Sequence, residues 1–217
     1  MNEPAAAYPD PGAQRLHRAL AELALCDPDV AWAIERVGLP APRNRPPGFA
    51  TLLRIITAQQ LSTKAAAAIQ ARLDAAMGGK TTPEAYLALD KTALRGCGLS
   101  ARKVVYGRAL AEALAAGRLD LAGLAEAPDE VVIEALTALP GFGRWSAEIY
   151  LLFALDRLDV LPADDLALQV GFQRLKRLDE RPKATAFRVA TEGWAPWRGA
   201  GSILLWHFYG AATLDEA

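Results

Sequence analysis

The sequence predicts an all-α fold, and three observations indicate it. Apolar residues recur at helical spacing, for example at Leu16, Leu20 and Leu23. No stretch alternates apolar and polar residues with the period of two that is typical of a strand. Segments rich in Pro and Gly interrupt the helical pattern, so we expect about ten short helices. With 217 residues, 52% of them hydrophobic, the chain can bury a core in one domain or two lobes.

The expected helices follow one another along the chain, each bounded by a turn signal. Good N-cap residues stand before several of them: Thr82 precedes Pro83, Ser100 precedes a helical stretch, and the pair Asp164 and Asp165 precedes another. The segments with the clearest helical period are 16–24, 52–59, 65–73, 130–139, 144–155 and 166–175.

The Pro-rich segment 40–48, PAPRNRPPG, is the expected lobe boundary. We expect one helical lobe over residues 48–157. Residues 1–47 together with 158–217 are expected to form the second lobe, with a cleft between the two.

Composition excludes several classes of protein. The start of the chain, MNEPAAAYPDPG, has neither a basic leader nor an apolar run, and the apolar segment 202–214 is too short to span a bilayer. The two cysteines, Cys26 and Cys97, are far apart in sequence, so they indicate neither a disulfide framework nor a metal cluster. We therefore expect a soluble cytoplasmic protein with no membrane partner.

The net charge of −1 does not suggest a strongly basic nucleic-acid binder, but the charge is unevenly distributed. Residues 172–198 hold seven basic residues against three acidic ones. Such an excess is compatible with a face that contacts phosphates, and equally with a solvated helix surface. The sequence leaves both interpretations open.

The segment LPGFG, residues 139–143, separates two helical stretches and predicts a helix, a short hairpin and a second helix. Gly141 and Gly143 have no side chain that would block a close approach, and the amides at the start of the second helix carry a positive dipole end. That arrangement suits a phosphate. A plain turn that uses glycine for its positive φ explains the pattern about as well.

At this point the residues resemble a known family. LPGFGRWSAEIY, residues 139–150, is similar to the helix-hairpin-helix motif of the helix-hairpin-helix-GPD DNA glycosylases, in the order L-P-G-φ-G-R-x-[ST]-A. The family continues with a Pro-rich loop and an essential aspartate, and DVLPADDLALQ matches that loop. Residues 49–73, 98–114 and 194–208 resemble further family segments in the family's order. The subgroup it resembles most is the bacterial 3-methyladenine DNA glycosylase II, or AlkA-type, enzymes.

The resemblance implies that Asp165 is the catalytic residue. A carboxylate at the start of a helix is stabilised by the helix dipole, and a negative charge would stabilise an oxocarbenium-like sugar or orient a water molecule. Asp164 is then expected to be the structural cap. The residues alone favour the interpretation that both acids are helix caps without a catalytic role.

The resemblance also assigns residues that contact DNA. It implies a base pocket with Trp145 and Trp206, whose alternative is a place in the core. Gln59, Ile149 and His207 are the other expected pocket residues; at the last two positions relatives carry aromatic residues, which leaves the substrate range open. Gln60 or Leu61 is expected to fill the gap left by a flipped nucleotide, although a glutamine pair on a helix is ordinarily a solvent-facing or a local hydrogen-bonding group. The expected contacts with the DNA backbone are Gly141, Phe142, Gly143, Arg144, Ser146 and Arg198.

The same resemblance limits the chemistry. Bifunctional relatives use a lysine where this chain has Trp145, and relatives with an iron–sulfur cluster need four clustered cysteines. We therefore expect a monomeric, monofunctional hydrolase without a cofactor, acting on alkylated purines in double-stranded DNA. The resemblance allows a monovalent cation at the carbonyls of residues 138–143. A glycosylase for uracil, mismatched or oxidised bases, or a DNA-binding module without catalysis, are the alternatives.

Overall fold

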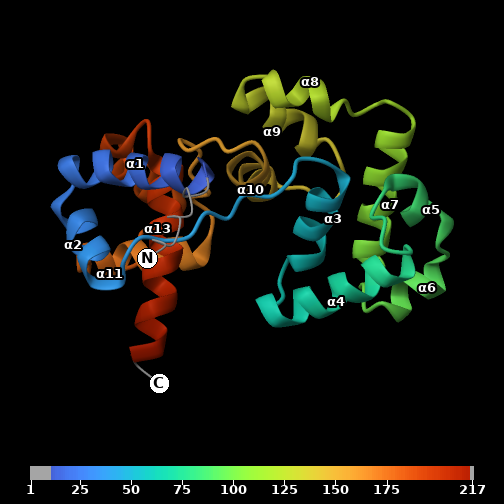
Figure 1. Cartoon of the computed structure of the whole chain (residues 1–217), viewed down its shortest axis with the longest axis horizontal. Helices are drawn as coiled ribbons and strands as arrows, with labels where there is room; N and C mark the ends of the chain where they lie inside the picture. The colour runs from blue at the N-terminus through green and yellow to red at the C-terminus, as the bar shows by residue number, and fades with distance from the viewer. Residues whose placement is uncertain (1–10, 216–217) are drawn as a thin grey trace, which may run out of the picture. The chain divides into compact units, whose positions relative to one another are not determined.

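The computed structural model describes residues 11–215, so most of the N-terminal segment interpreted above as lacking a leader lies outside the described residues. The chain divides into two compact units. One comprises residues 45–156 and is here called the hairpin unit; the other comprises residues 1–44 and 157–217 and is called the aspartate unit. Figure 1 shows helices throughout both, and the prediction of an all-α fold is confirmed.

The aspartate unit is built around its last helix. Helix α13 contacts α1, α2 and α11 (Figure 1). Its buried residues include Ile203 and Leu205. The centroid of the Phe172 ring on α11 lies 4.9 Å from that of Phe187 and 5.7 Å from that of Trp194. These aromatic contacts form part of the core of the unit. The helices of this unit are α1 (Pro11–Cys26), α2 (Pro28–Val37), α11 (Leu166–Lys176), α12 (Ala184–Ala190), the 3₁₀ turn η1 (Glu192–Trp194) and α13 (Arg198–Asp215).

The hairpin unit packs α4, α7 and α10 against α3. Tyr86 is fully buried against α7, where a Cβ atom at Gly107 would lie 2.4 Å from its hydroxyl, so only glycine fits there. The hydroxyl of Tyr150 accepts a hydrogen bond from the Gly48 amide at 3.1 Å and fixes the entry to α3. The helices are α3 (Phe49–Ala58), α4 (Thr63–Ala76), α5 (Pro83–Ala88), α6 (Lys91–Gly96), α7 (Ala101–Ala115), α8 (Leu121–Glu126), α9 (Asp129–Thr137) and α10 (Arg144–Ala154).

Residues 11–215 contain thirteen α-helices, more than the expected ten. The extra ones are short, such as α6 and α8, and each is started by an aspartate side chain, Asp90 or Asp120, that accepts a hydrogen bond from a first-turn amide. Such short helices cannot be detected from hydrophobic periodicity because they span fewer than two turns. None of the helices described is long and apolar enough to cross a membrane.

Candidate functional site

The hairpin between α9 and α10 uses its two glycines for different reasons. Gly141 has a φ of +89°, and a Cβ atom there would lie 2.3 Å from the ring of Tyr106. Both the backbone conformation and the packing of the unit therefore require glycine at this position. The interpretation as a plain turn accounts fully for Gly141.

Gly143 has no such explanation within the fold. Its φ of −100° is open to any residue, and a Cβ atom there would meet nothing within 4 Å. The residue is exposed and directly precedes α10, whose start carries no side-chain cap. Because nothing among residues 11–215 demands glycine here, the bare backbone at the start of α10 favours the alternative of close approach by an external group.

Gln59 joins the hairpin to the loop that follows α3. Its side-chain amide donates hydrogen bonds to the carbonyl of Gly141 at 2.8 Å and to the hydroxyl oxygen of Ser146 at 3.1 Å. Ser146 is buried, so its hydroxyl is used inside the unit. The next two residues are exposed: Gln60 has a φ of +57°, and the side chain of Leu61 is 40% exposed. The loop thus presents Gln60 and Leu61 outward while Gln59 anchors it.

Lys103 on α7 supports the same loop, and its charge is used within the unit. Its Nζ atom donates to the carbonyls of Thr57 at 2.8 Å and Gln59 at 2.7 Å, and burial lowers the pKa of its ammonium group. The carbonyls at the end of α3 are therefore the partners of this ammonium group.

Three other predicted residues of the hairpin unit turn inward or pair with acids. Phe142 is 6% exposed, and its amide donates to the carbonyl of Leu139 at 3.2 Å. Ile149 is buried as well. Arg144 bonds Glu130 at 2.6 Å, and this carboxylate, together with Glu148, raises the pKa of the guanidinium. Trp145, in the first turn of α10, is half-buried.

In the aspartate unit, Asp165 is the N-cap of α11. Its Oδ1 atom accepts hydrogen bonds from the Leu168 amide at 3.0 Å and from the Trp206 indole N–H at 3.1 Å. The expectation that Asp164 would cap this helix is wrong: its side chain is exposed and lies 3.9 Å from Arg188. The carboxylate that is catalytic by the resemblance is therefore held in one orientation by two hydrogen-bond donors, the Leu168 amide and the Trp206 indole.

The loop before Asp165 is held by side chains that sequence reasoning did not single out. The buried amide of Gln169 donates to the carbonyl of Ala163 at 2.7 Å, and Arg188 donates to the carbonyl of Leu161 at 3.1 Å. Arg181 in turn bonds the side-chain oxygen of Gln169. The position of Gln169 one helical turn after Asp165 was the only signal available in the sequence.

The indole of Trp206 also meets a cation. The guanidinium carbon of Arg43 lies 5.3 Å from the centroid of the Trp206 ring, a cation–π contact that the sequence did not reveal. The neighbouring His207 uses its Nε2 atom in a 2.8 Å contact with the carbonyl of Val37. Arg198, predicted to bind DNA, forms a two-pronged ion pair with Asp159 at 2.9 and 2.7 Å, which raises the pKa of the guanidinium.

The structure thus brings predicted residues together in two groups. Asp165 and Trp206 touch each other in the aspartate unit, and Gln59 bonds both Gly141 and Ser146 in the hairpin unit. Trp145 belongs to the hairpin unit. That Trp145 shares a pocket with Asp165 and Trp206 stays a prediction.

No group of three or more His, Cys, Asp or Glu residues in the described part of the chain could hold a metal ion. Of the hairpin carbonyls, that of Leu139 accepts from the Phe142 amide and that of Gly141 accepts from Gln59. A monovalent cation at these carbonyls stays a prediction.

An all-α chain with a glycine hairpin between two contacting helices, and with a capped aspartate further along, has the features of a helix-hairpin-helix protein. Residues 53–196 match the family model described as HhH-GPD superfamily base excision DNA repair protein, and the chain belongs to this family. The resemblance drawn from the sequence is confirmed.

Individual relatives agree with this assignment. The chain is 38% identical over 161 residues to DNA-3-methyladenine glycosylase 1 of Schizosaccharomyces pombe, covering 73% of this chain and 71% of that protein. It is 28% identical to DNA-3-methyladenine glycosylase 2 of Escherichia coli, covering 88% and 70%. Among solved structures, a 3-methyladenine DNA glycosylase of S. pombe in complex with abasic DNA is similar with a TM-score of 0.83 and 32% identity, covering 92% and 98%.

Proposed function

We propose that this protein is a monomeric, monofunctional DNA glycosylase that removes alkylated purines of the 3-methyladenine and 7-methylguanine type from double-stranded DNA. It hydrolyses the bond between base and sugar and leaves an abasic site. Membership of a base excision repair family supports this proposal, as do relatives that are named 3-methyladenine glycosylases and the relative whose structure holds abasic DNA.

The observation that carries the proposal is the carboxylate of Asp165, whose Oδ1 atom is fixed by the Leu168 amide and the Trp206 indole. As the base departs with the electron pair of the glycosidic bond, positive charge develops on the sugar. A carboxylate already oriented stabilises that charge without having to reorganise. It also accepts the proton of the water whose oxygen bonds to the sugar carbon.

A single carboxylate suffices for this class of substrate. Ordinary glycoside hydrolysis uses a second acid to protonate the leaving group. An alkylated purine such as 7-methylguanine already carries a positive charge, so its departure needs little help from an acid. The contact between Arg43 and Trp206 supports the same substrate class, since it marks the indole face as attractive to a flat cation.

The absence of an amine at position 145 favours hydrolysis over a lyase reaction. By the resemblance, bifunctional relatives form a Schiff base through a lysine at this place, where the present chain has Trp145. An indole has no amine that attacks the sugar. Water is therefore the proposed nucleophile.

The hairpin unit supplies the proposed contacts with DNA. The open backbone at Gly143 admits a phosphate at the start of α10, and the exposed Leu61 or Gln60 fills the space left in the stack by a flipped nucleotide. Gln59 has a positioning role in this account, since its amide ties that loop to the hairpin.

The test is incubation of the protein with methylated duplex DNA, followed by identification of the freed bases. We expect release of 7-methylguanine and 3-methyladenine, with the DNA strand left uncut at the abasic site until alkali is added. Release of uracil or of an oxidised base instead would point to another lesion. Binding of the duplex without release of any base would reduce the protein to a DNA-binding module.

A further inference from the structure

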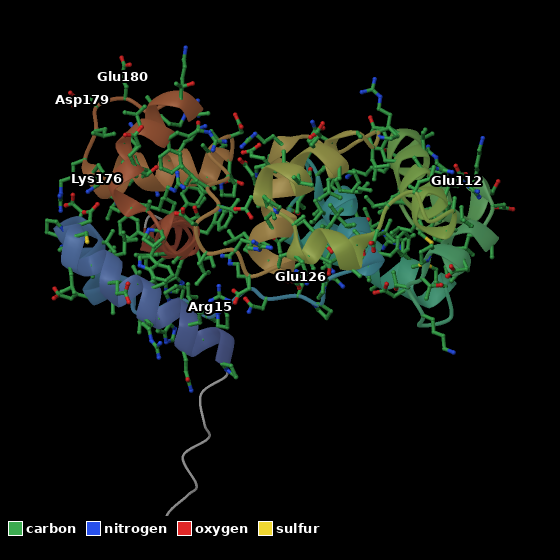
Figure 2. The ribbon with its side chains drawn as sticks, turned by 90° about the horizontal axis from the view of Figure 1, so that it is seen from above. Arg15, Glu112, Glu126, Lys176, Asp179 and Glu180 are labelled. Atoms are coloured by element: carbon green, nitrogen blue, oxygen red, sulfur yellow. The ribbon has the colours of Figure 1, made fainter. Side chains whose placement is uncertain are left out.

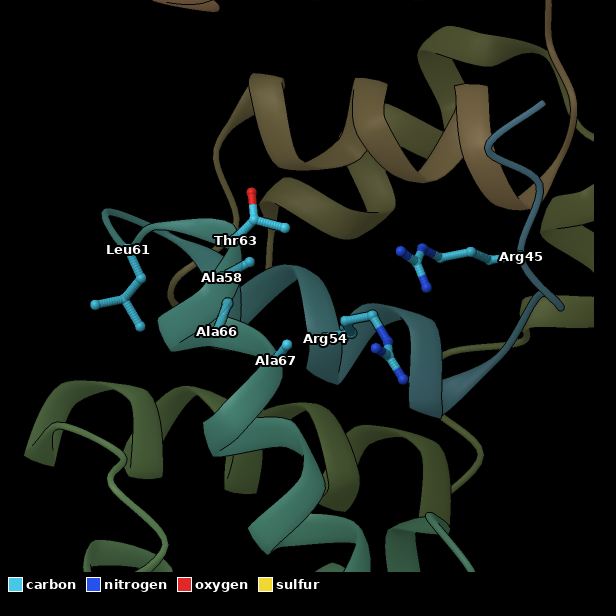
Figure 3. Close-up of a pocket in the computed structure, with 7 residues that line it drawn as sticks. All are labelled: Arg45, Arg54, Ala58, Leu61, Thr63, Ala66 and Ala67. Carbon is cyan, nitrogen blue, oxygen red and sulfur yellow. The ribbon is translucent and has the colours of Figure 1, made fainter. Parts of the chain in front are cut away.

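A small hollow in the hairpin unit lies between α3, α4 and the segment before α3. Its volume is about 220 Å³, less than the roughly 300 Å³ at which pockets for drug-sized ligands begin. Figure 3 shows Leu61 at one end of it and two arginines toward the other. The lining residues are Arg45, Arg54, Ala58, Leu61, Thr63, Ala66 and Ala67.

The two arginines are the unusual feature of this hollow. Among residues 11–215, no acidic side chain pairs with Arg45 or Arg54, whereas Arg144 in the same unit bonds two glutamates. Burial, and then the positive charge of Arg54, lower the pKa of Arg45. Two like charges that face one space without a counter-ion are mutually repulsive, and an anion between them would remove that cost.

The rest of the lining suits an anion of small size. The alanines Ala58, Ala66 and Ala67 have short side chains that leave the space open. Thr63 is the first residue of α4, a helix of fourteen residues, so the positive end of its dipole adds to the field of the two arginines. The planar guanidinium forks provide several N–H donors for the oxygens of one tetrahedral group.

We propose that Arg45 and Arg54 form a phosphate-binding site at this hollow, separate from the glycine hairpin. The source of the phosphate is the backbone of the DNA strand next to the flipped nucleotide, because Leu61, the residue proposed to fill the gap, lines the same hollow. This choice of source rests on the proposed function. A free phosphate compound has the same chemistry and is the alternative source.

The first arm of the test measures binding of a duplex with a non-hydrolysable abasic analogue, by fluorescence anisotropy over a range of salt concentrations. The pocket variant is Arg45→Gln with Arg54→Gln. The matched control, Lys80→Gln with Arg118→Gln, removes two charges from exposed positions of the same unit. For the pocket variant we expect weaker binding and a slope of log K against log salt that is less steep by about one, the value for one lost phosphate contact.

Unchanged affinity and slope in the pocket variant would overturn the assignment to DNA, as would an equal loss in the control. The second arm therefore follows Tm in inorganic phosphate against chloride of equal ionic strength. A rise in Tm that the pocket variant lacks, with DNA binding unaffected, would assign the site to a free phosphate compound. If both arms show no difference, no phosphate site exists.

Folding of the variants is checked by far-UV circular dichroism and by Tm without phosphate. We expect Arg54→Gln to unfold no earlier than the natural chain, since it removes a repulsion and breaks no ion pair. Neither arm of the test measures base release, so both are independent of the enzymatic activity. A protein that releases no base would overturn the proposed function and leave the result on the phosphate site standing.

Discussion

A basic stretch of the aspartate unit and two arginines of the hairpin unit differ in whether acidic side chains pair with their positive charges. In the aspartate unit, the basic stretch 172–198 finds partners from distant parts of the chain: Lys176 bonds Asp27 and Asp29, and Arg198 bonds Asp159. In the hairpin unit, Arg45 lies in the Pro-rich segment and Arg54 in an apolar stretch of sequence, and no acidic side chain among residues 11–215 pairs with either of them. A local excess of charge in a sequence therefore does not show which charges remain unpaired, because folding brings acidic partners from distant segments.

Figure 2 illustrates the difference along that basic stretch. Its acidic residues Asp179 and Glu180 point outward. The ammonium group of Lys176 instead bonds Asp27, the N-cap residue of α2, and Asp29 in the first turn of α2. The basic residues of the stretch act mainly inside their own unit. The side chain of Arg177 in this stretch is nevertheless 62% exposed, so part of the stretch is a solvated surface. That the stretch contacts phosphates stays a prediction.

The largest expected effect concerns the two hairpin glycines. It tests whether Gly141 is required by the fold while Gly143 is required for binding DNA. Gly141→Ala places a Cβ atom 2.3 Å from the Tyr106 ring in a conformation with positive φ. We expect a loss of about 2–5 kcal/mol of unfolding free energy, from backbone strain and overpacking together. Urea denaturation measures it.

Gly143→Ala is the matched control for that change. It should alter stability by less than about 1 kcal/mol, because a Cβ atom there has no atom of residues 11–215 within 4 Å, but it should weaken binding to an abasic-analogue duplex. Equal destabilisation by both substitutions would refute the division of roles.

The second effect tests the paired charges of the aspartate unit. Burial raises the pKa of Asp27, but hydrogen bonds from Lys176 and Trp194 outweigh it and hold the pKa below the ordinary value of 3.8. The unfolded chain then binds more protons than the folded one as the solution becomes acidic. The stabilisation is complete above the unfolded pKa and is lost as the pH falls through the folded pKa.

Asp27→Asn should cost about 1–3 kcal/mol at neutral pH, since Lys176 loses one of its two carboxylate partners. It should also flatten the acid limb of the stability curve, measured as Tm between pH 7 and pH 3. An acid limb as steep as that of the natural chain would show that other groups govern it.

The smallest expected effect concerns Arg43, which lies over the face of Trp206. If a cationic base stacks on the same face, Arg43 competes with it. Arg43→Gln should then lower KM for release of 7-methylguanine by about two- to fivefold, which corresponds to a cation–π contact of about 0.5–1 kcal/mol. Arg18→Gln, an exposed residue of the same unit, controls for the lost charge. A higher KM in the Arg43 variant alone would show that Arg43 assists binding.

The sequence predicted what depends on local chemistry. Helical periodicity gave the all-α class, and the cap residues Thr82 and Ser100 do accept hydrogen bonds from the amides of Ala85 and Lys103. It could not choose between Asp164 and Asp165 as the cap, because both are good N-caps and only the loop geometry separates them.

Contacts between segments that are distant in the chain could not be predicted from the sequence either. The ties from Lys103 to the end of α3, and the stacking of Arg43 on Trp206, join residues 44 or more positions apart. A single sequence carries no record of such pairs, since neither periodicity nor a local motif requires them.

The most direct measurement for the account as a whole is single-turnover release of methylated bases by Asp165→Asn. Asparagine also caps helices, so the fold and Tm should be preserved, and binding to an abasic-analogue duplex should remain. We expect the rate of base release to fall by about 10²–10⁴-fold, because the negative charge beside the sugar is gone. Base release at the natural rate by a folded Asp165→Asn protein would contradict it.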